Sequence, residues 1–568
     1  MEQIKQNVAK KLSEILEKEY EETYSLIEKP KDSSMGDFAY PCFKLAKEFR
    51  KAPFMIAEEI KTKILQDMPE AIKKIEAVAG YLNFFTDNSV VVKNTLSEIL
   101  DKKEGYLCSN IGEGKTICID YSSPNIAKPF HIGHLRSTVI GGAIYKLYKA
   151  LGYNVVGINY LGDFGTQFGY VIEGFKRFGS EEKLLEAPIK HLVEIYVKIN
   201  ELAKEDEEIV QAARRNFKAL EDGEEETTNL WKKFRSLSLE EYERVYKRLN
   251  ASFDSYNGEA YYNDKMQEVV DMLENKNLLT LSEGAKVVEL EGYNIPCMII
   301  KSNGSTTYAT RDLAAILDRS RTYDYYKSIY VTSYEQILHF NEVFEVAKNI
   351  VDEKYTSGLV HVPFGMVLGP GGKKLSTRKG ASVTLEDVLN ESVEKALSIL
   401  KEKGKVTDNI EETADIIGIG AIIFNDLKNN RIKDEIFDID EMLKFEGETG
   451  PYVQYTYVRT NSILSKVNFD PNTEIDYSLL KEKEEIELIK TLAKARQIIK
   501  TAAEEYEPSI LTRYIIDVAS GFSKYYNEHQ IITDNKELTE ARCALIYATG
   551  LIIKEGMNIL GIKCPERM

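Results

Sequence analysis

A strand, a long polar loop, a helix and a second strand follow one another between residues 116 and 160, and this succession limits the fold more than any other feature. The run Thr116–Tyr121 is apolar and β-prone, His134–Leu151 has helical spacing, and Asn154–Tyr160 is again β-prone. Two strands joined by a crossover helix form a parallel βαβ unit. The sequence therefore predicts an α/β fold with a doubly wound parallel sheet of the Rossmann type.

The loop between the first strand and its helix carries two histidines. It reads Ser-Ser-Pro-Asn-Ile-Ala-Lys-Pro-Phe-His-Ile-Gly-His from Ser122 to His134. Ligands of open α/β sheets bind at the carboxyl ends of the strands, where the next helix offers free N–H groups to an anion. Imidazoles donate to phosphate oxygens, and Gly133 lets a flat base approach the backbone without a Cβ in between. We expect His131, Gly133 and His134 to bind a nucleotide.

A glycine- and lysine-rich segment is the second candidate for phosphate chemistry. From Gly369 to Gly380 it reads Gly-Pro-Gly-Gly-Lys-Lys-Leu-Ser-Thr-Arg-Lys-Gly. Such a loop can close over a polyphosphate and neutralise the charge that develops in phosphoryl or nucleotidyl transfer. Its spacing is not that of a Walker A motif, and no G-x-G-x-x-G follows a strand. These two facts disfavour a P-loop hydrolase and a dinucleotide dehydrogenase.

The 568 residues divide into four predicted parts. A small α+β N-terminal domain covers 1–105, and a catalytic α/β domain covers 106–395 with a charged helical insertion at about 180–250. A helical connecting region, 396–450, precedes an all-helical C-terminal domain, 451–568. The glycine- and proline-containing segment Gly447–Pro451 marks the boundary between them.

Composition limits the partners and the location of the protein. The 74 basic and 91 acidic residues give a net charge of −17, which argues against coating nucleic acid or membranes through the overall field, although a local basic groove is compatible with it. The six cysteines form no C-x-x-C pair, so we expect no zinc site and no other metal site. No apolar stretch approaches the ~18 residues of a membrane span, and the first residues do not resemble a signal peptide. We expect a cytoplasmic protein that does not contact membranes.

The two loops together resemble the two signature motifs of class I aminoacyl-tRNA synthetases. These are His-Ile-Gly-His at the first strand–helix turn and Lys-Leu-Ser-Thr-Arg near the end of the same domain. Surrounding segments narrow the resemblance to the arginyl-tRNA synthetases, and it runs from end to end. The segments are Asp120–Lys128, His134–Thr138, Gly162–Gly169, Thr307–Ala315, Gln336–Phe340, Gly450–Tyr455 and Cys564–Met568.

This resemblance implies an arginine–tRNA ligase. Such an enzyme activates L-arginine with ATP and Mg²⁺, releases pyrophosphate, and transfers the arginyl group from arginyl adenylate to the 2′-hydroxyl of the terminal adenosine of tRNA(Arg). It also implies, weakly, a monomer. By resemblance the ATP-binding residues are His131, Gly133, His134, Lys373 and Lys374.

The second signature departs from the family pattern. Thr377-Arg378 stands where the family has a lysine after the serine, so the cation comes from Lys374, Arg378 or elsewhere. Arginyl enzymes with a similar departure carry a lysine just before the histidine motif, and Lys128 has this place here. The catalytic candidates are therefore Lys128, His131, His134, Lys374, Ser376 and Arg378.

A pocket for arginine needs acceptors at fixed positions, because a guanidinium is a planar fork of donors that stays charged. The positions that match the family's arginine pocket are Asn125, Glu259, Tyr308, Asp312 and Gln336. Tyr308 and Asp312 are one helical turn apart and share a helix face. By this resemblance Glu259 and Asp312 meet the positive charge, Tyr308 packs on the side chain or bonds to it, and Asn125 and Gln336 hold the amino-acid head.

The C-terminal helices resemble the family's anticodon-binding domain, and the N-terminal unit resembles the domain that touches the tRNA elbow. Tyr455 and Tyr457 are candidates for stacking on unpaired anticodon bases. Arg513 and Lys524 are candidates for contacts with the RNA backbone.

The sequence alone leaves two other functions open. One is a different class I synthetase, although a cysteinyl enzyme needs zinc-binding cysteines and an acidic amino acid needs a basic pocket. The other is a synthetase-like RNA-binding protein without charging activity. The intact His131, Gly133 and His134 argue against such a loss of catalysis.

Overall fold

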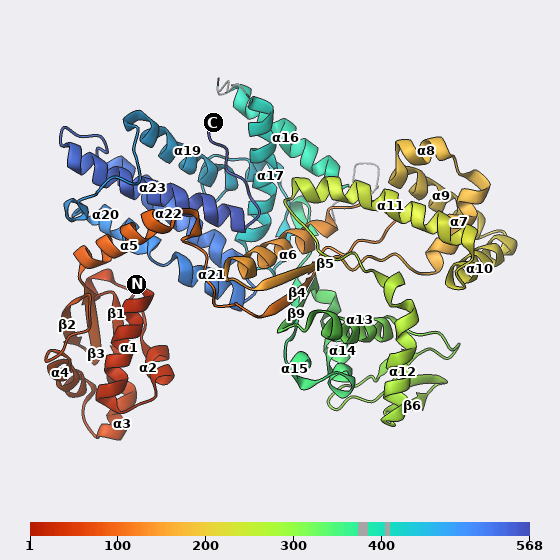
Figure 1. Ribbon diagram of the computed structural model, residues 1–568, viewed down its shortest axis with the longest axis horizontal. Helices are drawn as coiled ribbons and strands as arrows, with labels where there is room; N and C mark the ends of the chain where they lie inside the picture. Colours follow the sequence, from red (N-terminus) through yellow and green to blue (C-terminus); the bar gives the residue numbers. More distant parts are fainter. Residues whose placement is uncertain (373–383, 403, 405–408) are drawn as a thin grey trace. The chain divides into compact units, whose positions relative to one another are not determined.

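The computed structural model describes residues 1–372, 384–402, 404 and 409–568 and divides the chain into two compact units (Figure 1). The first unit comprises Met1–Leu107, Thr456–Ile499 and Tyr514–Glu555. The second unit comprises Cys108–Tyr455, Lys500–Arg513 and Gly556–Met568. The residues from 451 onward are thus shared between both units, and the division into four domains stays a prediction.

A parallel sheet of four strands, in the order β10-β9-β4-β5, forms the centre of the second unit. Helix α6 connects β4 to β5, and α14 connects β9 to β10 in the opposite direction along the sheet. Since such crossovers are right-handed, the two helices lie on opposite faces, as Figure 1 shows. The predicted doubly wound sheet is confirmed. Its elements are β4 (Thr116–Asp120), α6 (Gly133–Ala150), β5 (Asn154–Ile158), β9 (Lys327–Ser333), α14 (Ile337–Ile350) and β10 (Leu359–Phe364).

The apolar character of β4 follows from its central place in this sheet. Ile117, Cys118 and Ile119 are fully buried, because helices cover both faces. Helix α6 approaches the strand closely at Gly141, where a Cβ would come within 2.3 Å of Tyr121. The close packing fixes the position of the loop between β4 and α6.

A second, antiparallel sheet and two helices build the other part of this core. The apolar runs near residues 286–290 and 297–301 belong to this sheet, in the order β6-β7-β8, and not to the parallel one. Leu313 of α13 and Val343 of α14 are fully buried in the cluster that joins them. The elements are α12 (Met266–Asn275), β6 (Leu279–Ser282), β7 (Ala285–Val288), β8 (Cys297–Ile300) and α13 (Tyr308–Tyr323).

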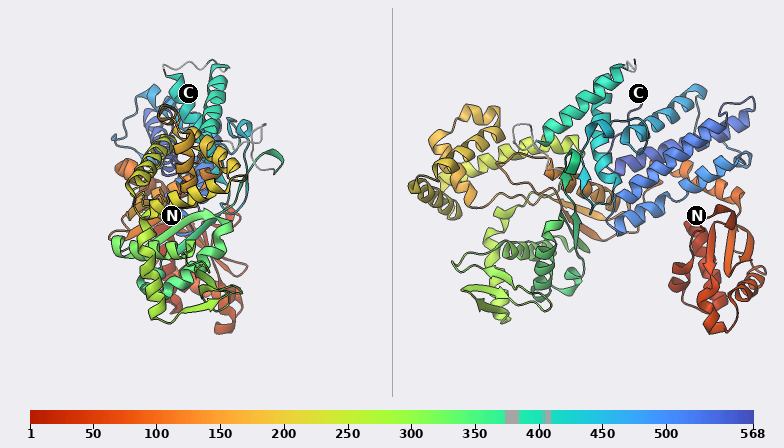
Figure 2. Two further views of the ribbon diagram at one scale, coloured as in Figure 1. Left: turned by 90° about the vertical axis from the view of Figure 1, so that its right-hand side faces the viewer. Right: turned by 180° about the vertical axis from the view of Figure 1, so that it is seen from behind.

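Helices fill the segment between β5 and α12, where the sequence predicted a helical insertion. They gather at one end of the second unit, and the long α11 runs back toward the sheet (Figure 2, right, orange to yellow). The helices are α7 (Thr166–Phe178), α8 (Glu181–Glu186), α9 (Pro188–Leu202), α10 (Glu207–Glu221) and α11 (Glu225–Arg248).

Helices also dominate after residue 384. Helix α16 packs on α17, where Ser392 Oγ donates to the Gly418 carbonyl at 2.8 Å. A two-stranded parallel pair, β11 (Val367–Leu368) with β12 (Glu435–Ile436), interrupts the helical order. The short helix α15 (Glu353–Thr356) precedes β10. The helices after residue 384 are α16 (Leu385–Glu402), α17 (Ile410–Lys428), α18 (Ile439–Met442), α19 (Gly450–Val467), α20 (Lys483–Leu492), α21 (Ala495–Glu504), α22 (Ser509–Glu528) and α23 (Lys536–Ile559).

The first unit begins with a three-stranded antiparallel sheet in the order β1-β3-β2. The β-prone run that ends at Phe85 contains a turn, since Ala79 and Gly80 have φ values of 49° and 83°. Val8 and Leu12 of α1 are fully buried in the core of this part. The elements are α1 (Glu2–Leu16), α2 (Tyr20–Leu26), β1 (Phe38–Pro41), α3 (Ala46–Phe49), α4 (Pro53–Ile64), β2 (Ile72–Val78), β3 (Tyr81–Thr86) and α5 (Asn88–Lys102).

Among the helices of the described residues, none combines the length and the apolar character that crossing a membrane requires.

Candidate active site

The loop after β4 is held in an unusual backbone shape. Ser122, Ser123 and Ala127 have left-handed φ values of 70°, 46° and 58°. Hydrogen bonds maintain this shape: the Ser122 N–H donates to Ser137 Oγ at 2.8 Å, and Ser123 Oγ donates to Asp120 at 2.9 Å. Backbone strain of this kind persists only where surrounding contacts impose it, and it is frequent at functional sites.

Helix α11 supports the same loop from the other side. The Tyr242 hydroxyl lies 2.8 Å from the carbonyl oxygens of both Asn125 and Lys128. The Asn125 side chain lies against Gly162, where a Cβ would come within 2.0 Å of its Oδ1. The side chains of Asn125 and Lys128 are therefore exposed on a loop whose backbone is fixed.

His131 and His134 face each other, with ring centroids 4.0 Å apart. The Gly133 N–H donates to His131 Nδ1 at 3.0 Å, so the neutral ring carries its proton on Nε2. A Cβ on Gly133 would lie 2.8 Å from the His131 ring. Packing against His131 therefore requires a glycine here, in addition to the approach of a base that the sequence analysis expected. His131 thus presents a fixed Nε2–H donor.

Both imidazoles are held in the neutral form. Burial, and next the His131 ring, lower the pKa of His134 to about 3. Burial, and next the positive charge of Lys128, lower the pKa of His131. Within the described part of the chain His134 Nδ1 is buried without a hydrogen-bond partner. The pair can donate hydrogen bonds to phosphate oxygens without adding a proton to them.

The second candidate loop is described only at its ends. Lys373, Lys374, Ser376 and Arg378 lie outside the described residues. Where the description resumes, Thr384 pairs with His131, and the Leu385 N–H donates to the Phe130 carbonyl at 2.8 Å. The chain is therefore beside the histidine motif directly after this loop.

The predicted arginine residues come from four segments of the second unit. Tyr308 and Asp312 lie on α13, Glu259 begins the 3₁₀ helix η4 (Glu259–Lys265), and Gln336 ends the 3₁₀ helix η5 (Tyr334–Gln336) after β9. Tyr308 is 69% exposed, and Gln336 is also exposed. Asn125 comes from the loop after β4, and among these residues Glu259 and Asp312 lie close enough for their charges to interact.

Two ion pairs connect these acceptors to residues that sequence reasoning missed. Arg311 Nη1 lies 3.4 Å from Glu259 Oε2, and the Arg311 guanidinium lies 6.0 Å from the centroid of the Tyr308 ring. His339 Nε2 lies 2.6 Å from Asp312 Oδ2. Arg311 and His339 lie inside the segments Thr307–Ala315 and Gln336–Phe340, which the resemblance had singled out, so their positions were available as a signal.

The electrostatics of the pocket follow from its burial. Burial raises the pKa of Glu259 to about 7, against the opposing charge of Arg311, and Asp163 and Asp312 contribute to the increase. Burial alone would lower the pKa of His339, but the hydrogen bond and charge of Asp312 outweigh it and raise that pKa.

A buried ion pair joins the two candidate sites. Arg319 of α13 donates through Nη2 to Asp120 Oδ2, at the end of β4, at 2.8 Å. The exposed fractions of the two side chains are 1% and 8%. The rings of Tyr160 and Tyr330 lie 5.4 Å and 5.5 Å from the Arg319 guanidinium. The helix that carries Asp312 is thereby fixed to the strand that carries the histidine loop.

The residues expected to bind tRNA lie in different surroundings. Tyr457 is only 7% exposed, so its ring packs in the interior and is not presented for stacking. Tyr455 is half-buried, and Arg513 is exposed. Lys524 is exposed and forms ion pairs with Glu487 at 3.2 Å and Glu484 at 3.5 Å. Tyr455 and Arg513 belong to the second unit, and Tyr457 and Lys524 belong to the first.

Comparisons with known proteins cover the whole chain. Three family models match this sequence. They are the catalytic domain of class I (R) tRNA synthetases at residues 95–439, the DALR anticodon binding domain at 453–568 and the arginyl tRNA synthetase N-terminal domain at 2–86. The arginine–tRNA ligase of Clostridium botulinum (strain Alaska E43) is 50% identical over 99% of this chain and 100% of its own. That of Halothermothrix orenii is 47% identical over 98% of both chains.

Solved structures agree with this result. The arginyl-tRNA synthetase of Thermus thermophilus has a TM-score of 0.81 at 24% identity and covers 95% of this chain and 96% of its own. The Plasmodium falciparum enzyme has a TM-score of 0.80 at 25% identity and covers 95% of this chain and 94% of its own. The first of these likenesses shows the fold alone.

The doubly wound sheet, the histidine motif at its first strand–helix turn and the match of the catalytic model define a class I aminoacyl-tRNA synthetase. Within that class the full-length relatives and the family models of the catalytic and N-terminal domains agree on the amino acid. The chain belongs to the arginyl-tRNA synthetase family, as the sequence resemblance predicted.

Proposed function

We propose roles for individual residues of this chain in the ATP-dependent ligation of arginine to tRNA, the activity of its family. The observation that carries the assignment is the Arg311–Glu259 ion pair, because it shows that a buried carboxylate of the predicted pocket accepts a guanidinium. Membership in the arginyl-tRNA synthetase family argues against the two other functions that the sequence alone left open.

ATP, which carries Mg²⁺ as part of the substrate, binds at the histidine loop. His131 donates from Nε2 and His134 supports it as a second neutral imidazole, while the exposed Lys128 supplies a positive charge to the phosphates. Gly133 lies next to the adenine. Lys373, Lys374, Ser376 and Arg378 stay predictions for the second loop, and its return beside His131 supports them.

Arginine binds where Glu259 and Asp312 lie. Its guanidinium meets these two carboxylates, Tyr308 covers the side chain, and Asn125 and Gln336 hold the amino-acid head. Lysine and citrulline are rejected, because either one leaves buried acceptors without partners, an effect that reaches ~10⁴ or more in such sites.

The reaction then needs positioning and charge stabilisation, with no protein nucleophile. A carboxylate oxygen of arginine attacks the α-phosphorus of ATP, and pyrophosphate leaves. The 2′-hydroxyl of the terminal adenosine next attacks the carbonyl of arginyl adenylate, its proton is released, and AMP leaves.

The proposed tRNA contacts come from exposed or half-buried side chains. Tyr455, Arg513 and Lys524 are retained as candidates, whereas the burial of Tyr457 favours a packing role. A monomeric state, a cytoplasmic location and the lack of a zinc requirement also stay predictions.

Charging of total tRNA with each of the twenty amino acids tests the activity, and pyrophosphate exchange with and without tRNA tests the first step. We expect charging with arginine alone. Asp312→Asn should lower kcat/KM for arginine at least tenfold with the KM for ATP unchanged, because it removes a carboxylate from the pocket. An unchanged arginine KM in this variant would refute the pocket, and charging with a different amino acid would refute the function.

A further inference from the structure

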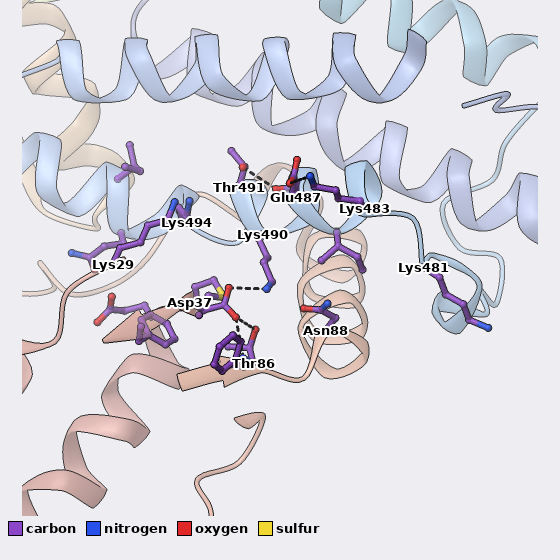
Figure 3. Close-up of a pocket in the computed structure, with 18 residues that line it drawn as sticks. Lys29, Asp37, Thr86, Asn88, Lys481, Lys483, Glu487, Lys490, Thr491 and Lys494 are labelled. Carbon is purple, nitrogen blue, oxygen red and sulfur yellow. Dashed lines mark hydrogen bonds and ion pairs between the residues drawn. The ribbon is translucent and has the colours of Figure 1, made fainter. Parts of the chain in front are cut away.

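The first unit contains a pocket that is lined by none of the residues assigned above to ATP, arginine or tRNA. Its volume is about 840 Å³, and it lies where β1 and the start of α5 face helices α20 and α21 (Figure 3). Small-molecule sites typically occupy roughly 300–1,000 Å³. The pocket is therefore large enough for a nucleotide.

Lysines dominate the charge of this pocket. Five lysines line it, against three carboxylates. Lys490 pairs with Asp37 at 2.7 Å, and Lys483 approaches Glu487 at 3.8 Å. Lys29, Lys481 and Lys494 have no carboxylate within ion-pair distance among the described residues. The pocket thus holds three lysines that form no direct ion pair with the described residues.

Asp37 holds Lys490 in place and is itself fully engaged. It accepts hydrogen bonds from the Thr86 N–H at 2.9 Å and the Thr86 hydroxyl at 2.7 Å, in addition to the ammonium of Lys490. Figure 3 shows Lys490 directed from α20 toward Asp37. The cation is positioned before any ligand arrives, which lowers the entropic cost of binding.

Lys29 and Lys494 lie next to each other in the same pocket. Burial, and next the charge of Lys29, lower the pKa of Lys494. Two neighbouring ammonium groups repel each other, and an anion between them removes this repulsion. A ligand with several negative charges fits this arrangement better than a single carboxylate does.

Apolar side chains line the remaining walls. Phe38 is buried and Phe85, Ile486 and Ile498 are half-buried. Asn88, exposed at the start of α5, offers an amide that both donates and accepts. Aromatic walls with one amide match a flat heterocycle with hydrogen-bonding edges.

We propose that this pocket binds a nucleoside polyphosphate, with its phosphates at Lys29, Lys490 and Lys494 and its base against Phe38 and Phe85. The apolar walls favour a small molecule over an RNA backbone, which offers phosphates and sugars on an extended surface. The site belongs to the first unit, whereas the histidine loop belongs to the second.

The test uses GTP and inorganic tripolyphosphate as probes, because ATP would also fill the catalytic site. Binding to the full chain is measured by calorimetry, and to the variant His131→Asn as a check that the catalytic site is not responsible. We expect GTP to bind both proteins equally and tripolyphosphate to bind more weakly, since it lacks the base. Lys29→Gln/Lys494→Gln should weaken GTP binding by roughly tenfold or more.

The matched control is Lys44→Gln/Lys63→Gln, which removes the same charge from exposed positions of the first unit outside the pocket. It should leave GTP affinity unchanged, and both double variants should keep the melting temperature and arginine charging of the parent. Equal loss in both double variants, no GTP binding by the parent at millimolar concentration, or equal affinity for GTP and tripolyphosphate would overturn the proposal. A loss of tRNA affinity without any GTP binding would do so as well, and would assign the lysines to RNA.

Discussion

Arg311 and Glu259 form an ion pair over 3.4 Å in the predicted arginine pocket, with exposed side-chain fractions of 14% and 15%. The pair keeps a positive charge beside a carboxylate that burial favours in its protonated form. An ionised carboxylate has about four acceptor positions, so the pair leaves room for a substrate guanidinium on the same group. Arg311 therefore acts as a positioning residue for Glu259.

Replacing Arg311 by Gln should raise the KM for arginine about tenfold at pH 7, because the pKa of Glu259 then rises further and the carboxylate is largely protonated. The increase should shrink as the pH is raised to 9. Arg311→Lys keeps the charge and should have a smaller effect. Steady-state kinetics between pH 6 and 9 measure this, and a KM that is equal in all three proteins would contradict it.

Glu259 should also make the arginine affinity of the unmodified enzyme dependent on pH. With a pKa of about 7, raised by burial, its ionised fraction falls from about 90% at pH 8 to about 10% at pH 6. The KM for arginine should therefore rise up to tenfold over this interval, and arginine binding near pH 7 should release protons. Calorimetry in buffers of different ionisation enthalpy detects the release, and Glu259→Gln should abolish it.

The same pKa has a consequence for folding. A carboxyl group whose pKa is higher in the folded state favours folding while it is protonated. This contribution is complete below the unfolded pKa of 4.5 and is lost as the pH rises through about 7.

His134 should act in its neutral form. His134→Asn should slow ATP–pyrophosphate exchange about 100-fold, because a fixed polar group at the phosphates is lost. No titration of His134 should appear between pH 6 and 9, since its pKa is about 3. His191→Asn is the control, because that histidine lies on α9 and accepts from the Ser180 N–H at 3.0 Å. Equal rates in the two variants would argue against the nucleotide site.

The lowered pKa of His134 also links stability to pH. The unfolded state binds a proton on this residue below pH 6.5, whereas the folded state does so only near pH 3. The contribution is therefore present above pH 6.5 and is lost progressively as the pH falls toward 3.

Asp426 should be essential for the stability of the second unit. Its Oδ1 lies 2.9 Å from Arg136 Nε, and the side chains are 3% and 1% exposed. Asp426→Ala leaves the Arg136 charge buried and should cost about 3–5 kcal/mol, whereas Arg136→Met/Asp426→Leu should cost less. Denaturant unfolding followed by circular dichroism measures this. Glu345→Ala, in the exposed pair with Lys348, should change stability by less than about 1 kcal/mol.

Local pattern sufficed to predict β4, α6 and β5, because their apolar spacing and their packing are set by neighbours in sequence. The strands β7 and β8 were also visible as apolar runs, but their sheet was not, since pairing depends on partners far along the chain. The turn at Ala79–Gly80 is not visible in the sequence pattern, because a run of β-prone residues does not show where its direction reverses.

The sequence pointed to candidate residues whose own side chains can bind a substrate. It did not point to residues that act by positioning a neighbouring side chain. His131, His134, Glu259 and Asp312 carry groups that bind phosphate or guanidinium, so resemblance singled them out. Arg311 and His339 became visible only through their contacts at 3.4 Å and 2.6 Å. The burial of Tyr457 likewise depends on the fold, because a tyrosine on a helix is equally compatible with the core and with a surface.

The ion pair between Asp120 and Arg319 has a consequence for the order of events in the enzyme. It fixes the end of β4, which leads into the nucleotide loop, to α13, which carries the guanidinium acceptors. A shift of either element on binding one substrate must therefore be shared by the other. By thermodynamic reciprocity, ATP should then increase the affinity for arginine by the same factor as arginine increases the affinity for ATP. We therefore expect the two substrates to act as effectors of each other through this ion pair.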